Sequence, residues 1–310
     1  MSCFRFIAAK KATFPISLLC EVLGVSRSGF HAWERRAPSA RARSDAWLLG
    51  RIRGIHDRAR GVYGAPRVHA QLRHEGVRVG RKRVERLMRQ ADLSGLITKK
   101  RGRTTIRVPG VRTAPDLVDR HFNPTTPDRL WCSDITYVRT WEGWLYLAAV
   151  MDCYSRRIVG WAMADHLRAE LVVDALEMAV ARRRPGPGLV HHSDGGGQYV
   201  ALLFGQRCRE AGIDLSMGAK GCALDNAVAE SFFASLKKEL LYRHSWPTKA
   251  AARTAIFDYI ESFYNRVRLH STLGQRSPEQ YEADTLIRPG ASLAASRLAH
   301  SPNMIKEHAA

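Results

Sequence analysis

The sequence has no apolar run long enough to cross a membrane. Its longest uncharged apolar stretch, Trp144 to Met151, is well under the roughly 18 residues that suggest a transmembrane helix. Six cysteines are spread along the chain without a Cys-x-x-Cys pair, and no signal-peptide pattern precedes them. These absences argue against secretion and membrane insertion. They predict a cytoplasmic protein with reduced cysteines.

Acidic residues are scarce in the first third of the chain. Residues 1–110 contain 25 lysines and arginines but only 7 aspartates and glutamates, a net charge of +18, whereas residues 111–310 carry +2. Such an excess of positive charge on one segment is typical of proteins that bind nucleic acids. The chain has 310 residues, 45% of them hydrophobic, which is enough for two or three domains.

Residues 16–35 contain two short helical patterns joined by a tight turn. Gly24 can adopt the positive φ of such a turn, Ser26 can cap the second helix, and Phe30 is spaced to pack back on the first. An ordinary αα-hairpin would give the same pattern. The basic charge favours a DNA-binding helix-turn-helix, with Arg27 as a candidate DNA contact.

A second unit of this kind follows in residues 61–98. Pro66 suits a first helical turn, and Gly76 ends that helix. The next predicted helix, Arg81 to Ala91, has Glu85 as its single acid among five bases, although a solvated helix face usually mixes both signs. Phosphate contact is therefore the predicted role of its bases, which are Arg81, Lys82, Arg83, Arg86 and Arg89.

Strand and helix patterns alternate after Pro127. Three β-rich segments come first, followed by a helix, a short strand, a second helix, a strand and a third helix. This order predicts an α/β core with a mixed five-stranded sheet, an antiparallel edge and helices on both faces. The predicted domains are an all-α helix-turn-helix region (1–60), the second helix-turn-helix-like unit (61–98), a basic linker (99–126), the α/β core (127–242), its helical extension (243–288) and a flexible tail (289–310).

Three acidic residues lie in unusual positions. Asp134 is in the middle of an apolar strand, where a carboxylate needs a partner. Asp194 ends a short strand and precedes three glycines, at the kind of strand end where open α/β sheets bind ligands. Glu230 lies on a helix whose core face is formed by other residues. Most helical glutamates are merely solvated, and only the two aspartates favour a functional role for this one.

Converging carboxylates make a hard, negative site that suits Mg²⁺ or Mn²⁺ better than Zn²⁺. Two such ions about 3.5–4 Å apart can activate an attacking oxygen and stabilise the leaving oxygen of a phosphodiester. The neighbouring His191 and His192 are expected to pack near the site rather than to bind metal. The residues thus indicate a phosphoryl-transfer centre attached to a polyanion-binding segment.

The spacing of the acids is similar to that of a known family. Fifty-nine residues separate Asp134 from Asp194, 35 separate Asp194 from Glu230, and Lys237 follows seven positions later. With further matches over residues 61–282, this closely resembles the Asp-Asp-35-Glu core of the retroviral integrase superfamily, in particular the second-reading-frame transposases of bacterial insertion sequences. The matching motifs include Asp134-Ile135-Thr136-Tyr137, His192-Ser193-Asp194-Gly195, Glu230-Ser231-Phe232-Phe233, Phe263-Tyr264-Asn265, Arg268, His270-Ser271 and Ser277-Pro278.

The resemblance implies an RNase H-like core in which Asp134, Asp194 and Glu230 bind two Mg²⁺ or Mn²⁺ ions and catalyse DNA strand cleavage and transfer. Lys237 would touch the DNA end, and the helix-turn-helix units would bind the terminal inverted repeats. Target DNA, a homo-oligomer on DNA, association with the bacterial nucleoid, and fusion to or a complex with an upstream-frame protein are further implications. Gly197, where the family usually has serine, and Gly218-Ala219 depart from the pattern.

Two other functions share parts of this pattern. A catalytically idle DNA-binding protein derived from a transposase needs only the basic first third, but it has no physical need to keep acids at a strand centre and on an outward helix face. A nuclease that hydrolyses without joining would share the metal site. Two sequence-recognition units are unnecessary in a general nuclease, which favours the transposase.

Overall fold

The computed structural model describes residues 3–96, 114–118, 121–194, 197–217 and 227–287. The expected linker lies mostly outside these ranges, and the expected C-terminal tail lies wholly outside them. No helix in the described part of the chain is long and apolar enough to span a membrane.

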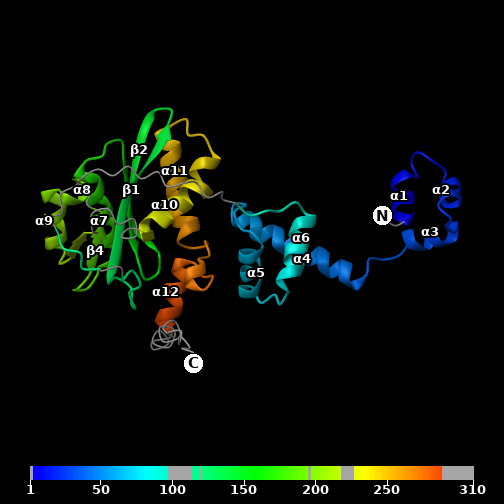
Figure 1. Ribbon diagram of the computed structural model, residues 1–310, viewed down its shortest axis with the longest axis horizontal. Helices are drawn as coiled ribbons and strands as arrows, with labels where there is room; N and C mark the ends of the chain where they lie inside the picture. Colours follow the sequence, from blue (N-terminus) through cyan, green and yellow to red (C-terminus); the bar gives the residue numbers. More distant parts are fainter. Residues whose placement is uncertain (1–2, 97–113, 119–120, 195–196, 218–226, 288–310) are drawn as a thin grey trace, which may run out of the picture.

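Three short helices form the N-terminal unit, which Figure 1 shows apart from the rest of the chain. They are α1 (Cys3–Lys10), α2 (Ile16–Val22) and α3 (Arg27–Glu34). Gly24 has φ +62°, and the Ser26 hydroxyl accepts a hydrogen bond from the Gly29 amide at 3.0 Å, as the sequence predicts for this turn and cap. Ile7 and Phe30 are fully buried in a small separate core. Because Ile7 lies on α1, which the sequence patterns did not predict, the unit has three helices rather than two.

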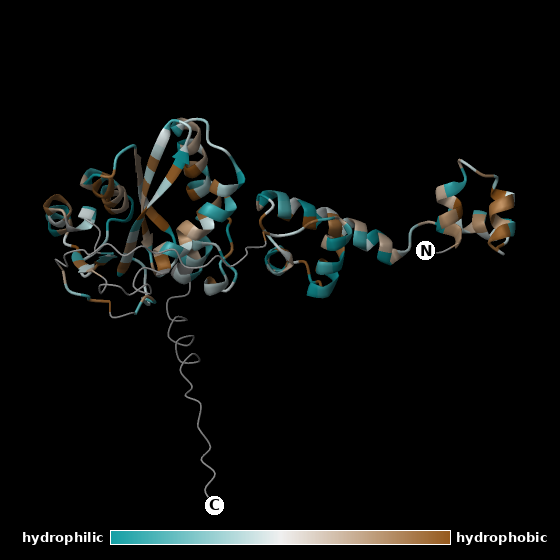
Figure 2. Cartoon of the chain, turned by 45° about the horizontal axis from the view of Figure 1, so that its top comes forward, coloured by the Kyte–Doolittle hydropathy of each residue, from teal (hydrophilic) through white to brown (hydrophobic). Residues whose placement is uncertain are grey.

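Three further helices form a middle unit, and Figure 2 colours much of it as hydrophilic. They are α4 (Ala40–Arg58), α5 (Ala65–His74) and α6 (Arg81–Gln90). The last two match the second predicted unit, whereas α4 was not predicted. Gly50 and Gly54, both poor helix formers, and basic residues around much of α4 obscure its periodicity. Since α4 packs on α5 and α6, the boundary expected at residue 60 separates a helix from its packing partners.

A mixed five-stranded sheet forms the centre of the C-terminal unit. Its strands are β1 (Leu130–Thr140), β2 (Gly143–Asp152), β3 (Ile158–Ala164), β4 (Val190–Ser193) and β5 (Asp214–Met217). Their spatial order is β3-β2-β1-β4-β5: β1, β2 and β3 are antiparallel neighbours, and β4 runs parallel to both β1 and β5. The mixed α/β sheet predicted from the sequence is confirmed.

Helices cover both faces of this sheet. On one face α7 (Ala169–Arg183) packs on β2 and β3, and Gly160 allows the close approach because a Cβ there would lie 2.2 Å from the Ala175 carbonyl oxygen. The other face is covered by α10 (Ala227–Glu239) and α11 (Lys249–Asp258). The remaining helical segments are α8 (Gly197–Val200), α9 (Leu202–Glu210), a 3₁₀ turn (Leu241–Arg243), a π-helical turn (Tyr259–Tyr264), a second 3₁₀ turn (Ser271–Leu273) and α12 (Pro278–Ile287).

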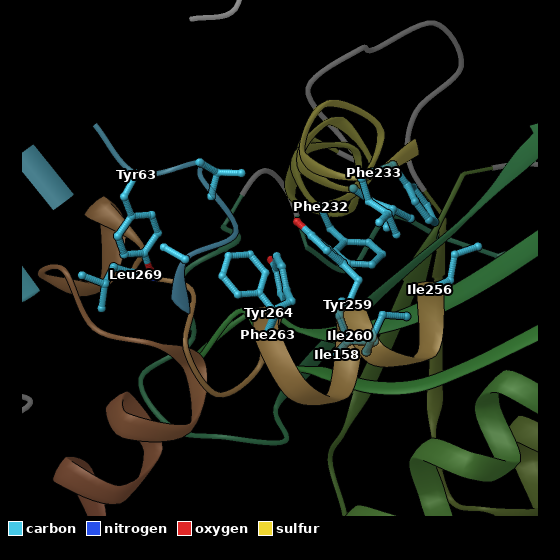
Figure 3. Packing of buried hydrophobic residues seen from close by; sticks show 14 of the residues in the cluster. Tyr63, Ile158, Phe232, Phe233, Ile256, Tyr259, Ile260, Phe263, Tyr264 and Leu269 are labelled. Atoms are coloured by element: carbon cyan, nitrogen blue, oxygen red, sulfur yellow. Dashed lines mark hydrogen bonds between the residues drawn. The ribbon is translucent and has the colours of Figure 1, made fainter. Parts of the chain in front are cut away.

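Tyr63 joins the middle unit to the C-terminal unit. Its side chain is buried, and its hydroxyl donates a hydrogen bond to the Val267 carbonyl at 2.9 Å and accepts one from the Leu269 amide at 2.7 Å. Figure 3 shows Tyr63 and Leu269 beside the aromatic residues of the π-helical turn. One apolar cluster therefore runs from α4 into the C-terminal unit.

Candidate active site

The register of β1 and β4 brings the two predicted aspartates together. The strands pair in parallel up to Ser133 opposite Ser193, so Asp134 and Asp194 each follow the last paired residue of their strand. Both aspartates line one cleft of about 140 Å³. The other residues of its wall are Ile135, Tyr137, Tyr146, Leu167, Gln198 and Tyr199. Of these, sequence analysis did not place Tyr146, Leu167 or Gln198 near the acids.

Glu230 lies on α10, which packs across β1. The core face of this helix is the predicted one, and Glu230 is exposed on a different face. The buried residues of the core face are Val228, Phe232, Leu236 and Leu240. Glu230 does not line the cleft, and no three His, Cys, Asp or Glu side chains of the described residues are grouped closely enough to hold a metal ion. The structure thus brings two of the three predicted acids, Asp134 and Asp194, into one cleft.

Burial and the neighbouring carboxylates raise the pKa of Asp134 to about 7. Desolvation is the largest cause, and the charges of Asp194 and then Glu230 act in the same direction. A hydrogen bond from the Ile135 amide and the charge of Lys237 oppose them. An oxygen-rich site in which carboxylates repel one another fits a hard divalent cation, whose charge would favour the ionised form.

Asp134→Asn is expected to stabilise the metal-free protein at pH 8. The folded-state pKa of about 7 lies above the ordinary value of about 3.9, so ionisation of Asp134 costs folding free energy. The cost is absent below pH 4 and grows as the pH rises to 7, up to about 4 kcal/mol. Thermal unfolding in EDTA between pH 5 and pH 8 measures it. Parallel pH profiles of the unfolding temperature for the two proteins would contradict the expectation. Added Mg²⁺ should reduce the difference in unfolding temperature between them.

Lys237 lies on α10 beside the cleft. Its ammonium nitrogen is 5.7 Å from the centroid of the Tyr137 ring, and Tyr137 is part of the cleft wall. A cation at this distance from an aromatic face is attracted to it. Lys237 is half-buried, so it can hold this position and still meet a ligand that enters the cleft.

The predicted DNA-contact residues of α6 have different surroundings. Arg83 and Arg86 both form ion pairs at 2.7 Å with Asp45 of α4. Arg81 pairs with Glu85 of its own helix at 2.7 Å. Lys82 and Arg89 are exposed, as is Arg27 at the start of α3. The sequence analysis missed Asp45 as a partner because the helix that carries it was not predicted.

The two histidines before Asp194 are part of the core. His192 is buried, and its Nδ1 lies 2.9 Å from the hydroxyl of Ser216. His191 packs against the rings of Tyr199 and Phe204, and burial lowers its pKa to about 3. Both therefore have the packing role expected from the sequence. Gly218-Ala219, one of the departures from the family pattern, lies outside the described residues.

The chain matches known families over most of its length. Residues 124–223 and 230–286 match two families that are each described as "Integrase core domain", and residues 42–101 match one described as "HTH-like domain". "Transposase InsF for insertion sequence IS3A" of Escherichia coli (strain K12) is 38% identical over 285 residues, which cover 91% of this chain and 99% of that protein. The chain belongs to the insertion-sequence transposases. The family and the enzyme class predicted from the motifs are therefore confirmed.

A second transposase and a solved integrase core are also similar to this chain. "Transposase for insertion sequence element IS629" of Shigella sonnei is 40% identical to this transposase over 274 residues, 87% of this chain and 92% of that protein. The similar solved structures include the catalytic core domain of BIV integrase, with 20% identity over 52% of this chain and 97% of that chain and a TM-score of 0.39.

Proposed function

We propose that this transposase binds the terminal inverted repeats of an insertion sequence, cleaves DNA strands at their ends and joins them to target DNA, with Asp134, Asp194 and Glu230 as its catalytic residues. The observation that carries the proposal is the β1–β4 register, which sets Asp134 and Asp194 side by side in one cleft. Strand transfer by chains that lack one acid at a time tests it. Any such chain that keeps substantial activity would remove that residue from the assignment.

Two Mg²⁺ or Mn²⁺ ions are the cofactors that this donor set fits. When bound, they would lower the pKa of the attacking water or DNA 3′-hydroxyl and neutralise charge on the phosphate. Asp134 and Asp194 would hold them from the two strand ends. Glu230 would approach from α10, since cations cancel the repulsion through which its charge now raises the pKa of Asp134.

Among the described residues at the two strand ends, the serines are not exposed for a covalent mechanism. Ser133, Ser193 and Tyr199 are all buried beneath the strand ends, where a phosphodiester cannot reach them. Tyr137 is the exposed hydroxyl-bearing side chain of the cleft wall, and its ring packs edge-to-face on Trp144. We infer that water and then a DNA 3′-hydroxyl, rather than this tyrosine, are the attackers. This supports direct transfer between DNA strands without a protein–DNA bond.

The two ends of a mobile element must be brought together before they are joined to a target. At least two copies of the chain on DNA satisfy this need, and we infer a homo-oligomer that associates with the nucleoid through DNA. We also infer a fusion to, or a complex with, an upstream-frame protein. Light scattering of the chain with and without end DNA, and with that partner, tests both inferences; a monomer in every case would contradict them.

Neutralising Lys82 and Arg89 together is expected to flatten the salt dependence of DNA binding. For each phosphate that the chain no longer neutralises, the slope of log K against log salt should fall by about 0.9. The Arg83→Gln/Arg86→Gln pair should change the slope less, because these side chains already neutralise Asp45. Binding titrations at several salt concentrations measure both slopes, and Arg207→Gln, on exposed α9 and paired with Glu210, is the control. If neither α6 pair changes the slope, this helix is not a phosphate-binding surface.

A further inference from the structure

Large aromatic side chains are exposed on the β1–β2 hairpin. Tyr137 is 61% exposed, Trp144 46% and Trp141 76%. Beyond Ser133, β1 has no pairing with β4, so this part of the sheet extends past its parallel half. Exposed aromatic clusters cost solvation free energy and commonly mark binding surfaces.

The sheet holds Tyr137 and Trp144 in a fixed arrangement. Tyr137 pairs across the strands with Tyr146, and Arg139 pairs with Trp144, so Tyr137 and Trp144 are diagonal neighbours on one face. Their ring centroids are 5.2 Å apart with an interplanar angle of 87°. In this edge-to-face pair the edge of one ring meets the face of the other, and the exposure of both residues leaves aromatic surface open to a ligand.

This aromatic pair begins at the catalytic cleft. Tyr137 lines the same cleft as Asp134 and Asp194, and Trp144 lies next to it on the side away from the acids. A nucleic-acid strand with a phosphate at the aspartates would therefore bring its neighbouring nucleotide onto Tyr137. An aromatic ring offers such a nucleotide a flat surface that suits any base.

The charges around the pair suit a polyanion. Lys237 lies over the Tyr137 ring, and exposed Arg139 is opposite Trp144 in the register and takes part in no ion pair among the described residues. The nearby acid of the hairpin, Glu142, is directed to α11, where its carboxylate accepts a hydrogen bond from the Lys249 amide at 2.7 Å. A symmetric contact of this surface with the same surface of a second copy would bring like charges against Arg139 and Lys237, which disfavours self-association of that kind.

We propose that Tyr137 and Trp144 form a stacking platform for an unpaired nucleobase of the DNA strand held at the acids. The proposal rests on the proposed function only in that DNA enters the acidic cleft. The base must be unpaired because a base within a duplex has both of its faces covered by its neighbours. The platform would hold the strand end in place without reading its sequence.

The experiment compares two DNA probes with Ca²⁺ in place of Mg²⁺, because carboxylate oxygens also bind this ion but its larger, less regular coordination does not suit the reaction. One is a blunt duplex, and the other is the same duplex with a three-nucleotide single-stranded overhang that carries 2-aminopurine. The unsubstituted chain is expected to quench the fluorescent base and to bind the overhang probe more tightly. Tyr137→Ala and Trp144→Ala should abolish the quenching and weaken overhang binding about 5- to 100-fold, with blunt-duplex binding unchanged.

Two matched variants separate stacking from general damage. Tyr137→Phe keeps the ring and should keep the quenching. Tyr242→Ala removes an equally exposed tyrosine from outside the hairpin and should change nothing. Unchanged quenching in Tyr137→Ala would overturn the proposal, as would equal weakening of blunt and overhang probes, which indicates a duplex-binding surface.

Light scattering of the DNA-free chain tests whether a second copy of the chain binds to this surface. If Tyr137→Ala or Trp144→Ala dissociates an oligomer of the DNA-free chain, the surface is an interface between copies and the proposal is overturned. Failure of the catalytic assignment would be seen differently, as strand transfer by an acid variant. That result would leave the preference for the overhang probe intact.

Discussion

Replacement of Asp134, Asp194 or Glu230 by alanine is expected to abolish strand cleavage and joining, with a loss on the order of 10³-fold or more. In the proposed mechanism each carboxylate removed would take away a ligand of the ions that stabilise both the attacking and the leaving oxygen. Binding of end DNA should stay nearly intact, because affinity rests mainly on the basic first third of the chain. Labelled end DNA with Mg²⁺, run on denaturing gels, measures both reactions.

Asp214→Ala is the matched control for these variants. Asp214 is an exposed aspartate at the start of β5, two strands away from β1 and at the opposite strand end from the acids. The Asp214→Ala variant should cleave and join DNA like the unsubstituted chain.

The same gels test for a covalent intermediate. DNA label that stays with the protein after boiling in detergent would contradict direct transfer and identify a covalent nucleophile instead.

Glu230→Ala is the most informative of the three. Glu230 is exposed and does not line the cleft, so an ordinary solvated glutamate would give a fully active variant. Its effect on the pKa of Asp134 places its charge within electrostatic reach of the aspartates. An inactive Glu230→Ala chain that still binds DNA would support its inclusion in the metal site.

The core of the fold was predictable because its signals are local. The apolar alternation of β1, the helical face of Val228, Phe232 and Leu236, and the short run before Asp194 each identify an element without reference to another. The antiparallel order of β1, β2 and β3 follows from the preference of consecutive strands for antiparallel neighbours. The pairing of β4 with β1 does not follow in this way, because α7 connects β4 to β3 at the far edge of that meander.

What the sequence could not supply depends on contacts between distant segments. Asp45 pairs with Arg83 and Arg86 from a helix whose own pattern is weak. Trp144 contacts Tyr137 only because of the strand register. The alternating pattern of one strand does not determine which residue of the other strand lies diagonally opposite. The acids were found because each is locally anomalous, whereas the aromatic pair is ordinary until the strands are aligned.

The buried ion pair between Arg268 and Glu239 of α10 also joins segments that are distant in the sequence. Arg268 and Glu239, at the end of α10, have side chains that are each 8% exposed. The guanidinium Nη2 and Nε donate to the two carboxylate oxygens at 2.7 and 2.9 Å, and the Tyr259 hydroxyl donates to the same carboxylate at 2.8 Å. Arg268 also donates to the hydroxyl of Ser235 on α10 at 3.0 Å. The segment after the π-helical turn thereby fixes the helix that carries Glu230.

Arg268→Met is expected to destabilise the protein by about 3–5 kcal/mol, because it leaves the Glu239 carboxylate buried without its partner. Arg67, 3.9 Å away, is too distant to replace the bidentate contact. The Arg268→Met/Glu239→Met double variant removes both charges and should recover much of the loss. Arg207→Met, which breaks the exposed pairs with Glu177 and Glu210, should leave the stability nearly unchanged. Urea unfolding of the four proteins measures these differences. If the double variant is no more stable than Arg268→Met, packing rather than the unpaired charge accounts for the loss.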